Sequence, residues 1–254
     1  MSRNIQRYGW IPDLPDQRDY LYYSPIHVLK ALPVSVDLRP VCPPVYDQGQ
    51  LGSCTANAIA GAIEFDQIKQ QLARIFVPSR LFIYYNERAM EGTVNSDSGA
   101  MIRDGVKSVA TQGGCSESEW PYIISQFTVK PPQKCYQDAL AHKVTLYQRI
   151  TPTLSQLKGC LASGYPFVFG FTVYESFESD TVAQTGIVPM PRYGEQVLGG
   201  HAVVAVGYND TQQWFIVRNS WSDQWGDKGY CYMPYAYLTN SQLASDFWTI
   251  QSVS

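Results

Sequence analysis

The sequence lacks the features that would place it in several other functional classes. No Lys/Arg cluster able to neutralise successive phosphates occurs in the 254 residues, and the net charge is -3, so we expect no nucleic-acid partner. No apolar run approaches the roughly 20 residues that cross a bilayer, so we expect no membrane partner either. Charged residues are scarce at 16%, whereas 45% of the residues are apolar. This balance excludes a disordered chain and predicts a substantial buried core.

A secretory signal is also missing. Residues 1–7 are basic, but no apolar segment follows them, as it would in a signal peptide. By default we expect a cytoplasmic protein, with a leader already removed as the open alternative.

Histidine is rare, and the cysteines are not arranged as metal ligands usually are. There are three His residues, and no two of the six cysteines are separated by the short spacing of a zinc motif. We therefore expect neither a metal nor an organic cofactor.

The apolar pattern changes along the chain. Residues 1–36 contain Pro12 and Pro15 in a segment without helical periodicity, which predicts an extended N-terminal arm. Apolar residues at steps of three or four predict helices, and apolar runs or alternation after Gly164 predict strands. The expected helices cover 53–72, a segment after Ser79, 100–111 and 153–163, and the expected strands cover 167–173, 202–208, 214–218 and 229–233. An α+β fold follows, mainly helical over about 47–140 and mainly β over about 141–254, with a cleft between the two parts.

Cys54 is a candidate nucleophile because of its place at the predicted start of the first long helix. A thiol must ionise to attack, and the unpaired N–H groups of a helix first turn favour the thiolate. A lone cysteine at such a place is more often an ordinary buried residue, so the assignment depends on the rest of the sequence.

Three blocks of sequence provide that context. The first is Gln48-Gly49-Gln50-Leu51-Gly52-Ser53-Cys54, the second runs from Leu198 through His201 to Gly207-Tyr208, and the third is Asn219-Ser220-Trp221 followed by Trp225-Gly226 and Gly229-Tyr230. In this order they resemble the segments that surround the catalytic residues of the papain family of cysteine peptidases. The absence of a large pro-domain and the sequence before residue 50 resemble the prokaryotic and viral branch of that family.

The resemblance implies a papain-like two-domain fold over residues 37–254, with a helical left half and an antiparallel, β-barrel-like right half that enclose the active-site cleft. It implies a cysteine endopeptidase that hydrolyses a protein or peptide through a thioester. Cys54 would be the nucleophile, His201 its base and Asn219 the residue that orients the base, while Gln48 would complete the oxyanion hole. Trp221 would cover the His–Asn pair and Trp225 the leaving-group side.

The resemblance also locates a substrate pocket. By alignment, its walls are small or apolar and uncharged, which predicts preference for a bulky apolar side chain one residue upstream of the one that donates the scissile carbonyl. The pocket residues are Gly99, Met101, Gly170, Gly200 and Ala202.

Two departures from the family affect the disulfides. Leu51 stands where many relatives have a disulfide cysteine, and Thr55 stands where they usually have an aromatic residue. That disulfide is therefore expected to be missing. Of the remaining cysteines, Cys115 and Cys135 share the helical half and are the pair we expect to be joined, if any pair is.

Other functions stay open at this stage. The same acyl-enzyme could transfer its acyl group to an amine, or the cleft could bind ligands without catalysis. Residues 1–36 also have two alternatives, either a brace across the two halves or a pro-segment that lies in the cleft and inhibits the enzyme, as in a zymogen.

Overall fold

The helical side is built around one long buried helix. The computed structural model describes residues 8–254, and in it α2 (Cys54–Lys69) is buried from Cys54 to Gln67. It packs against α3 (Arg80–Glu91), α4 (Ile102–Thr111) and the central strands of the large sheet. Because α2 is surrounded on all sides, its apolar residues are not confined to a single stripe.

The ends of α3 follow from local chemistry. The Ser79 hydroxyl accepts a hydrogen bond from the backbone N–H of Phe82 at the N-terminus, and Gly92 ends the helix with a φ of 73°. The shorter helices are α1 (Ile26–Lys30), α5 (Gln133–Ala139), α6 (Leu154–Ala162), α7 (Asp180–Thr185), α8 (Tyr235–Leu238) and the 3₁₀ turns η1 (Arg39–Val41), η2 (Ile124–Gln126) and η3 (Glu175–Glu178).

The β side is a large, mainly antiparallel sheet with the order β2-β5-β10-β6-β7-β8-β9, and β3 pairs with β7 off this path. Its strands are β2 (Leu21–Tyr22), β3 (Ser35–Asp37), β5 (Val144–Ile150), β6 (Phe167–Tyr174), β7 (Val197–Asn209), β8 (Trp214–Arg218), β9 (Tyr230–Pro234) and β10 (Ala244–Val253). Within residues 8–254 no pairing joins β2 to β9, so the sheet is not a closed barrel.

Strand β6 separates two cores because its side chains alternate between faces. Phe167, Phe169 and Phe171 point into a core formed within the β side. Val168 belongs to the second core, which also contains Cys54 and much of α2. The two cores thus meet at the sheet, and the start of α2 lies against its face.

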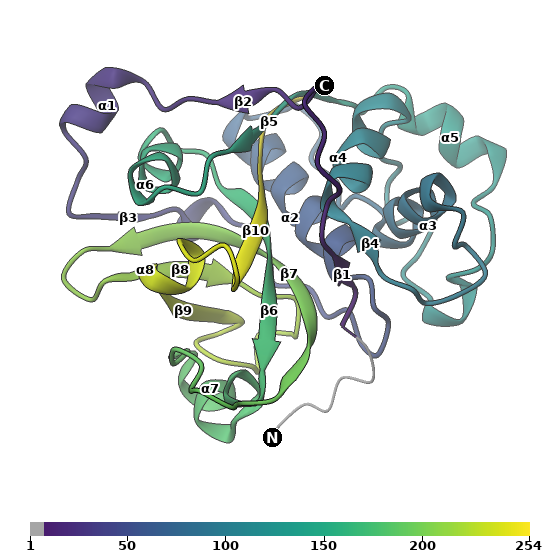
Figure 1. Ribbon diagram of the computed structural model, residues 1–254. Coiled ribbons are helices and arrows are strands. Elements are labelled where there is room, and N and C mark those ends of the chain that lie inside the picture. Colours follow the sequence, from purple (N-terminus) through teal and green to yellow (C-terminus); the bar gives the residue numbers. More distant parts are fainter. Residues whose placement is uncertain (1–7) are drawn as a thin grey trace.

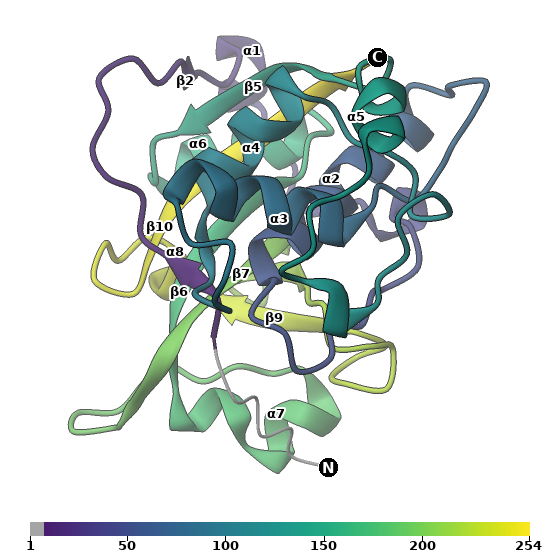
Figure 2. The same cartoon turned by 90° about the vertical axis from the view of Figure 1, so that its right-hand side faces the viewer.

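The N-terminal arm runs between the two sides. Figure 1 shows its first part, in dark purple around β1, rising between the helices on the right and the sheet on the left, after which β2 and α1 lie at the upper left. In Figure 2 the helical side faces the viewer. Its strand β1 (Trp10–Ile11) pairs in parallel with β4 (Ala100–Met101) of the helical side. Further along, Ile26–Lys30 forms the short helix α1 within the expected extended arm.

The predicted elements are largely confirmed. All four expected helices and all four expected strands are present, with ends shifted by a few residues. The sequence reasoning missed β5 and β10, which pair with each other and extend the sheet.

Candidate active site

Cys54 is the first residue of α2, and its thiol is completely buried. Burial raises the pKa of this thiol to about 12, while backbone N–H groups of Ala202, Gly9 and Thr55 directed at the sulfur lower it. The N–H of Ala202 comes from the residue next to His201, so the fold brings the start of α2 against strand β7. The N–H of Gly9 comes from the arm.

His201 lies on β7 and Asn219 directly after β8, and these strands are neighbours. The imidazole Nε2 is 2.8 Å from the Asn219 Oδ1. Oδ1 also accepts the backbone N–H of Ser220 at 2.8 Å, which fixes the orientation of the amide. Since Oδ1 can only accept, Nε2 carries the proton, and Nδ1 is the nitrogen available for proton exchange.

Two tryptophans enclose this pair. The ring of Trp221 lies 5.0 Å from the His201 ring at an interplanar angle of 31°, and Trp225 packs edge-on against Trp221 at 5.1 Å. Both indoles are buried, so the His201–Asn219 hydrogen bond is shielded from water.

Gln48 is fixed by three hydrogen bonds to Ser220 and to the loop that precedes Cys54. Its backbone N–H donates to the Ser220 carbonyl at 2.9 Å, and its Oε1 accepts the Ser220 hydroxyl at 2.6 Å. Its Nε2 donates one hydrogen to the Leu51 carbonyl at 3.0 Å. These bonds set the amide with its NH₂ group toward the loop that precedes Cys54, and a primary amide has a second N–H to offer.

The expected pocket residues surround one side chain of the arm, Trp10. A Cβ atom on either Gly170 or Gly200 would collide with the indole, so both glycines create the space that it fills. Ala202 pairs with Gly170 across β6 and β7 and shares the buried core with Trp10.

The other two pocket residues contact the arm backbone. Gly99 lies so close to Gly9 that a Cβ would collide with the Gly9 carbonyl. The N–H of the next residue, Ala100, donates to this carbonyl at 2.8 Å, and Met101 is the β-partner of Ile11. The seven expected substrate-binding residues thus fall into two groups, one around Trp10 and Gly9 and one beside His201.

Sequence reasoning missed a buried carboxylate at the end of the Trp10 pocket. Asp246 Oδ2 accepts the Trp10 indole N–H at 3.2 Å and the backbone N–H of Asp13 at 2.8 Å, and Oδ1 accepts from Arg149 at 3.0 Å. The sequence did offer a signal, because Asp246 is an acidic residue within the apolar segment 243–250. A carboxylate buried there needs hydrogen-bond or ionic partners. Tyr8, which donates to Glu178 and lies 5.9 Å from the His201 ring, was also missed.

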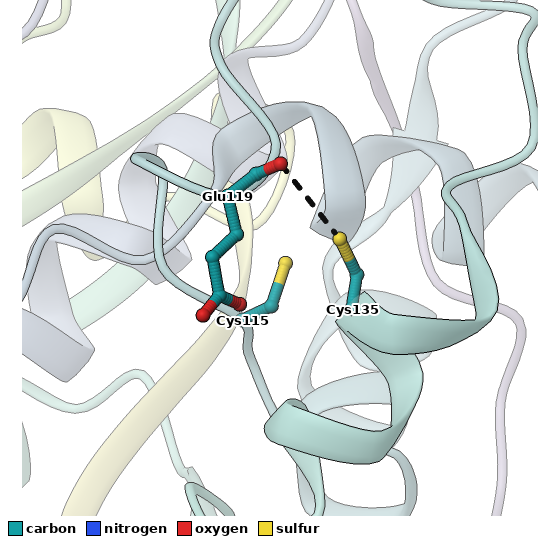
Figure 3. A group of neighbouring side chains, drawn as sticks. All are labelled: Cys115, Glu119 and Cys135. Carbon is teal, nitrogen blue, oxygen red and sulfur yellow. Dashed lines mark hydrogen bonds between the residues drawn. The ribbon is translucent and has the colours of Figure 1, made fainter.

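The cysteines differ from the expectation. Cys115 and Cys135 lie beside each other (Figure 3), but both are free thiols, as are the other four cysteines. The candidate pair is therefore not joined in this structure. Among residues 8–254 no helix has the length and apolarity needed to cross a membrane.

Comparison with known proteins assigns the family. A family model described as papain family cysteine protease matches residues 32–249. An uncharacterised peptidase C1-like protein of Acanthamoeba polyphaga mimivirus is 44% identical over 278 residues, covering 100% of this chain and 88% of that protein. A cathepsin B-like protein of Giardia intestinalis is 31% identical, covering 78% of this chain and 68% of that protein.

A solved structure agrees with these sequence relatives. The crystal structure of xylellain, a cysteine protease from Xylella fastidiosa, superposes with a TM-score of 0.92 at 47% identity and covers 97% of this chain and 96% of that one. The chain therefore belongs to the papain family of cysteine peptidases, with the α+β papain-like fold.

Proposed function

We propose that the protein is an endopeptidase that uses Cys54, His201 and Asn219 as a catalytic triad and holds its N-terminal arm in the cleft as an inhibitor. The observation that carries the first half is the 2.8 Å contact of His201 Nε2 with Asn219 Oδ1. Because Nε2 is bound to Asn219, Nδ1 is the ring nitrogen that exchanges protons. Cys54, the first residue of α2, would be its partner.

The chemistry follows from this arrangement. Once the thiol has passed its proton to His201 Nδ1, the sulfur attacks the substrate carbonyl. The oxyanion that forms accepts hydrogen bonds from the Cys54 backbone N–H and from the second N–H of Gln48 Nε2. The imidazolium then protonates the leaving amine, which leaves a thioester on Cys54. In the second step His201 takes a proton from water, and the hydroxide releases the acid.

The arm supports the second half of the proposal, because it covers the reacting atoms. Gly9 lies against Gly52 of the Cys54 loop, with no room for a Cβ. Trp10 fills the expected substrate pocket, and Tyr8 lies over His201 and Trp221. A substrate could not reach Cys54 until these residues had moved.

The Gly9 carbonyl is not placed for attack by the thiol. The group of Gly9 directed at the Cys54 sulfur is its N–H, whereas its carbonyl is bound to the N–H of Ala100 at 2.8 Å. Nucleophilic attack needs a carbonyl carbon next to the sulfur with its oxygen in the oxyanion hole. The Gly9–Trp10 bond is therefore not placed for cleavage by Cys54.

Trp10→Ala in the full chain tests the proposal. Loss of the indole removes the contacts with Gly170 and Gly200 and the bond to Asp246, so the arm opens more often. We expect the peptidase rate and the rate of Cys54 alkylation by an epoxide inhibitor to rise together, about tenfold, which corresponds to about 1.4 kcal/mol. Tyr23→Ala is the matched control, because Tyr23 is an exposed aromatic residue of the same arm.

The two halves of the proposal fail differently. Unchanged rates in Trp10→Ala, with the fold intact, would reject inhibition by the arm but not the triad. An active Cys54→Ala variant would reject the triad. An amine added at physiological concentration tests for acyl transfer. If more of the acyl group were transferred to the amine than to water, the enzyme would be an acyl transferase instead.

A further inference from the structure

Three side chains far from the cleft converge in the helical side. The two thiol sulfurs of Cys115 and Cys135 and one carboxylate oxygen of Glu119 all lie within 4.8 Å of one another. Figure 3 shows Cys115 and Glu119 on one loop and Cys135 opposite them on α5. The sequence marks the two cysteines as a candidate pair across 19 intervening residues, but nothing in it marks Glu119 as a third member of the group.

The backbone holds this arrangement in place. Gly113 has a φ of 80°, and a Cβ there would collide with the carbonyl of Ala139 at the end of α5, so the loop approaches the helix as closely as glycine permits. The Cys115 carbonyl accepts the Ser79 N–H at 2.8 Å. The Cys135 sulfur lies 4.0 Å from the Glu119 carbonyl.

Two thiols and one carboxylate thus share a buried place. Cys115 and Cys135 are 0% and 2% exposed, and Glu119 Oε2 is buried without a hydrogen-bond partner among residues 8–254. Burial raises the pKa of both thiols. The Cys135 thiol and then Glu119 raise the pKa of Cys115 further, whereas a hydrogen bond with Cys115 lowers the pKa of Cys135 and Glu119 raises it. Lys134 lowers the pKa of Cys135, but by less than Glu119 and Asp138 each raise it.

We propose that Cys115, Glu119 and Cys135 bind one Zn²⁺ ion. Two thiolates and a carboxylate form a donor set that zinc accepts, whereas Mg²⁺ and Ca²⁺ prefer oxygen alone. From Zn–S and Zn–O bonds of about 2.3 and 2.0 Å, tetrahedral geometry requires S–S and S–O separations of about 3.8 and 3.5 Å. The present spacing of at most 4.8 Å reaches these values by small rotations of the three side chains.

The site has a route from solvent. Glu119 also lines a surface hollow of about 260 Å³, together with Ser116, Asp138, His142 and Arg74. An ion can enter from this hollow, and a water molecule in it can occupy the fourth position of the tetrahedron. Arg74 opposes an incoming cation, whereas Asp138, whose Oδ2 is also buried without a partner among the described residues, favours it.

Binding releases protons, because each thiol must ionise to become a ligand. Zn²⁺ displaces one proton from Cys115 and one from Cys135, and the Glu119 carboxylate binds without further change. The apparent affinity therefore rises with pH, by up to about a hundredfold per pH unit while both thiols are protonated in the free protein.

The test uses the full chain carrying Cys54→Ala, so that the reactive thiol takes no metal. Zn²⁺, and Cd²⁺ as its spectroscopic substitute, are titrated at two pH values. We expect one ion per chain by native mass spectrometry, release of two protons, and a ¹¹³Cd resonance with the chemical shift of a two-sulfur site. This part needs no change in the site itself, so it does not depend on how site variants fold.

Variants then assign the ligands. Cys115→Ala and Cys135→Ala should each weaken binding by at least about 100-fold, and Glu119→Gln by about tenfold or more, since even residues that only support a ligand contribute 10–100-fold. Cys231→Ala is the matched control, because Cys231 is an equally buried thiol on β9 and should leave binding unchanged.

Three results would overturn the site. The first is the absence of stoichiometric binding at pH 8 with micromolar Zn²⁺. The second is unchanged binding in Cys115→Ala or Cys135→Ala. The third is a mass, measured without reductant under denaturing conditions, two hydrogens below that of the all-thiol chain with Cys115 and Cys135 in one linked peptide, because a disulfide would then occupy this place.

Discussion

The thiol of Cys54 is subject to opposing influences on its ionisation. The first turn of α2 and three backbone N–H groups favour the thiolate, whereas complete burial beneath the arm favours the thiol and prevails, with a pKa of about 12. Gly9 lies against Gly52 and directs its N–H at the sulfur, so opening of the arm would hydrate the sulfur and lower its pKa. Access of substrate and activation of the nucleophile would then be a single event.

Substitutions within the proposed triad should have graded effects. Cys54→Ala should abolish acylation and leave the fold intact, because alanine fits a helix first turn. His201→Ala should lower kcat/KM by a factor of about 10³ or more, and Asn219→Ala by less, since the imidazole would keep its place beside the sulfur. Cys42→Ala, at a partly exposed thiol, is the control. A peptidase rate in Cys54→Ala above a tenth of the original rate would exclude Cys54 as the nucleophile.

The pocket that holds Trp10 predicts the substrate preference. Its walls at Gly170, Gly200 and Ala202 carry no charge, and the Asp246 carboxylate at its end is already paired with Arg149. A fluorogenic peptide panel should therefore show Leu, Phe or Trp preferred at the position upstream of the residue that donates the scissile carbonyl. If Arg or Glu were preferred there, the pocket assignment would be wrong.

At the scale of elements, β10 links the arm to the sheet through its buried carboxylate. Burial and the neighbouring Asp13 raise the pKa of Asp246 to about 6, while Arg149 and the donors from the arm lower it. A carboxyl whose pKa is raised in the folded state binds its proton more tightly there than in the unfolded chain. Its contribution to stability is therefore full below about pH 4 and lost as the pH rises through 6.

Asp246→Asn should remove this pH dependence. The free energy of unfolding of the original chain, measured with urea, should fall between pH 4 and pH 7 by at most about 3 kcal/mol from this group, given a shift of about two pKa units. The variant should show a flatter profile, because asparagine accepts from Trp10 without titrating. Asp223→Asn, at an exposed carboxyl, should keep the original slope, and a slope unchanged in Asp246→Asn would refute the assignment.

Elements that are determined by a local apolar pattern could be predicted from the sequence, whereas elements that depend on contacts between distant segments could not. Helix α2 and strands β7 and β8 were predictable because their apolar patterns reflect burial of consecutive residues. The pairing of Trp10 with Ala100 was not, because two-residue strands about 90 positions apart have no local pattern. The triad candidates were found through family motifs, whereas Asp246 and the Cys115–Glu119–Cys135 group arise only when distant segments fold together.

At the scale of the whole molecule, the arm combines a segment that we propose to block the cleft and a segment that braces the sheet. Tyr8, Gly9 and Trp10 occupy the cleft, whereas β2 pairs with β5 and its residue Tyr22 is buried in the core of the β side. Between them Asp19 is bound to Arg103 at 2.6 Å and Arg149 at 3.1 Å. The proposed inhibition and the bracing therefore involve different residues, so truncation can separate them.

Two truncations make the last prediction. Deletion of residues 1–12 removes the cleft contacts but keeps Asp13, Asp19 and Tyr22, so the peptidase and alkylation rates should rise by about an order of magnitude with little loss of stability. Deletion of residues 1–32 should raise the rates equally but lower the melting temperature further, because burial of Tyr22 and the Asp19 ion pairs are lost. A peptide of residues 8–19 should inhibit either protein only weakly, since tethering supplies an effective concentration in the millimolar range. If both truncated proteins stayed folded with unchanged rates, the arm would be only a brace.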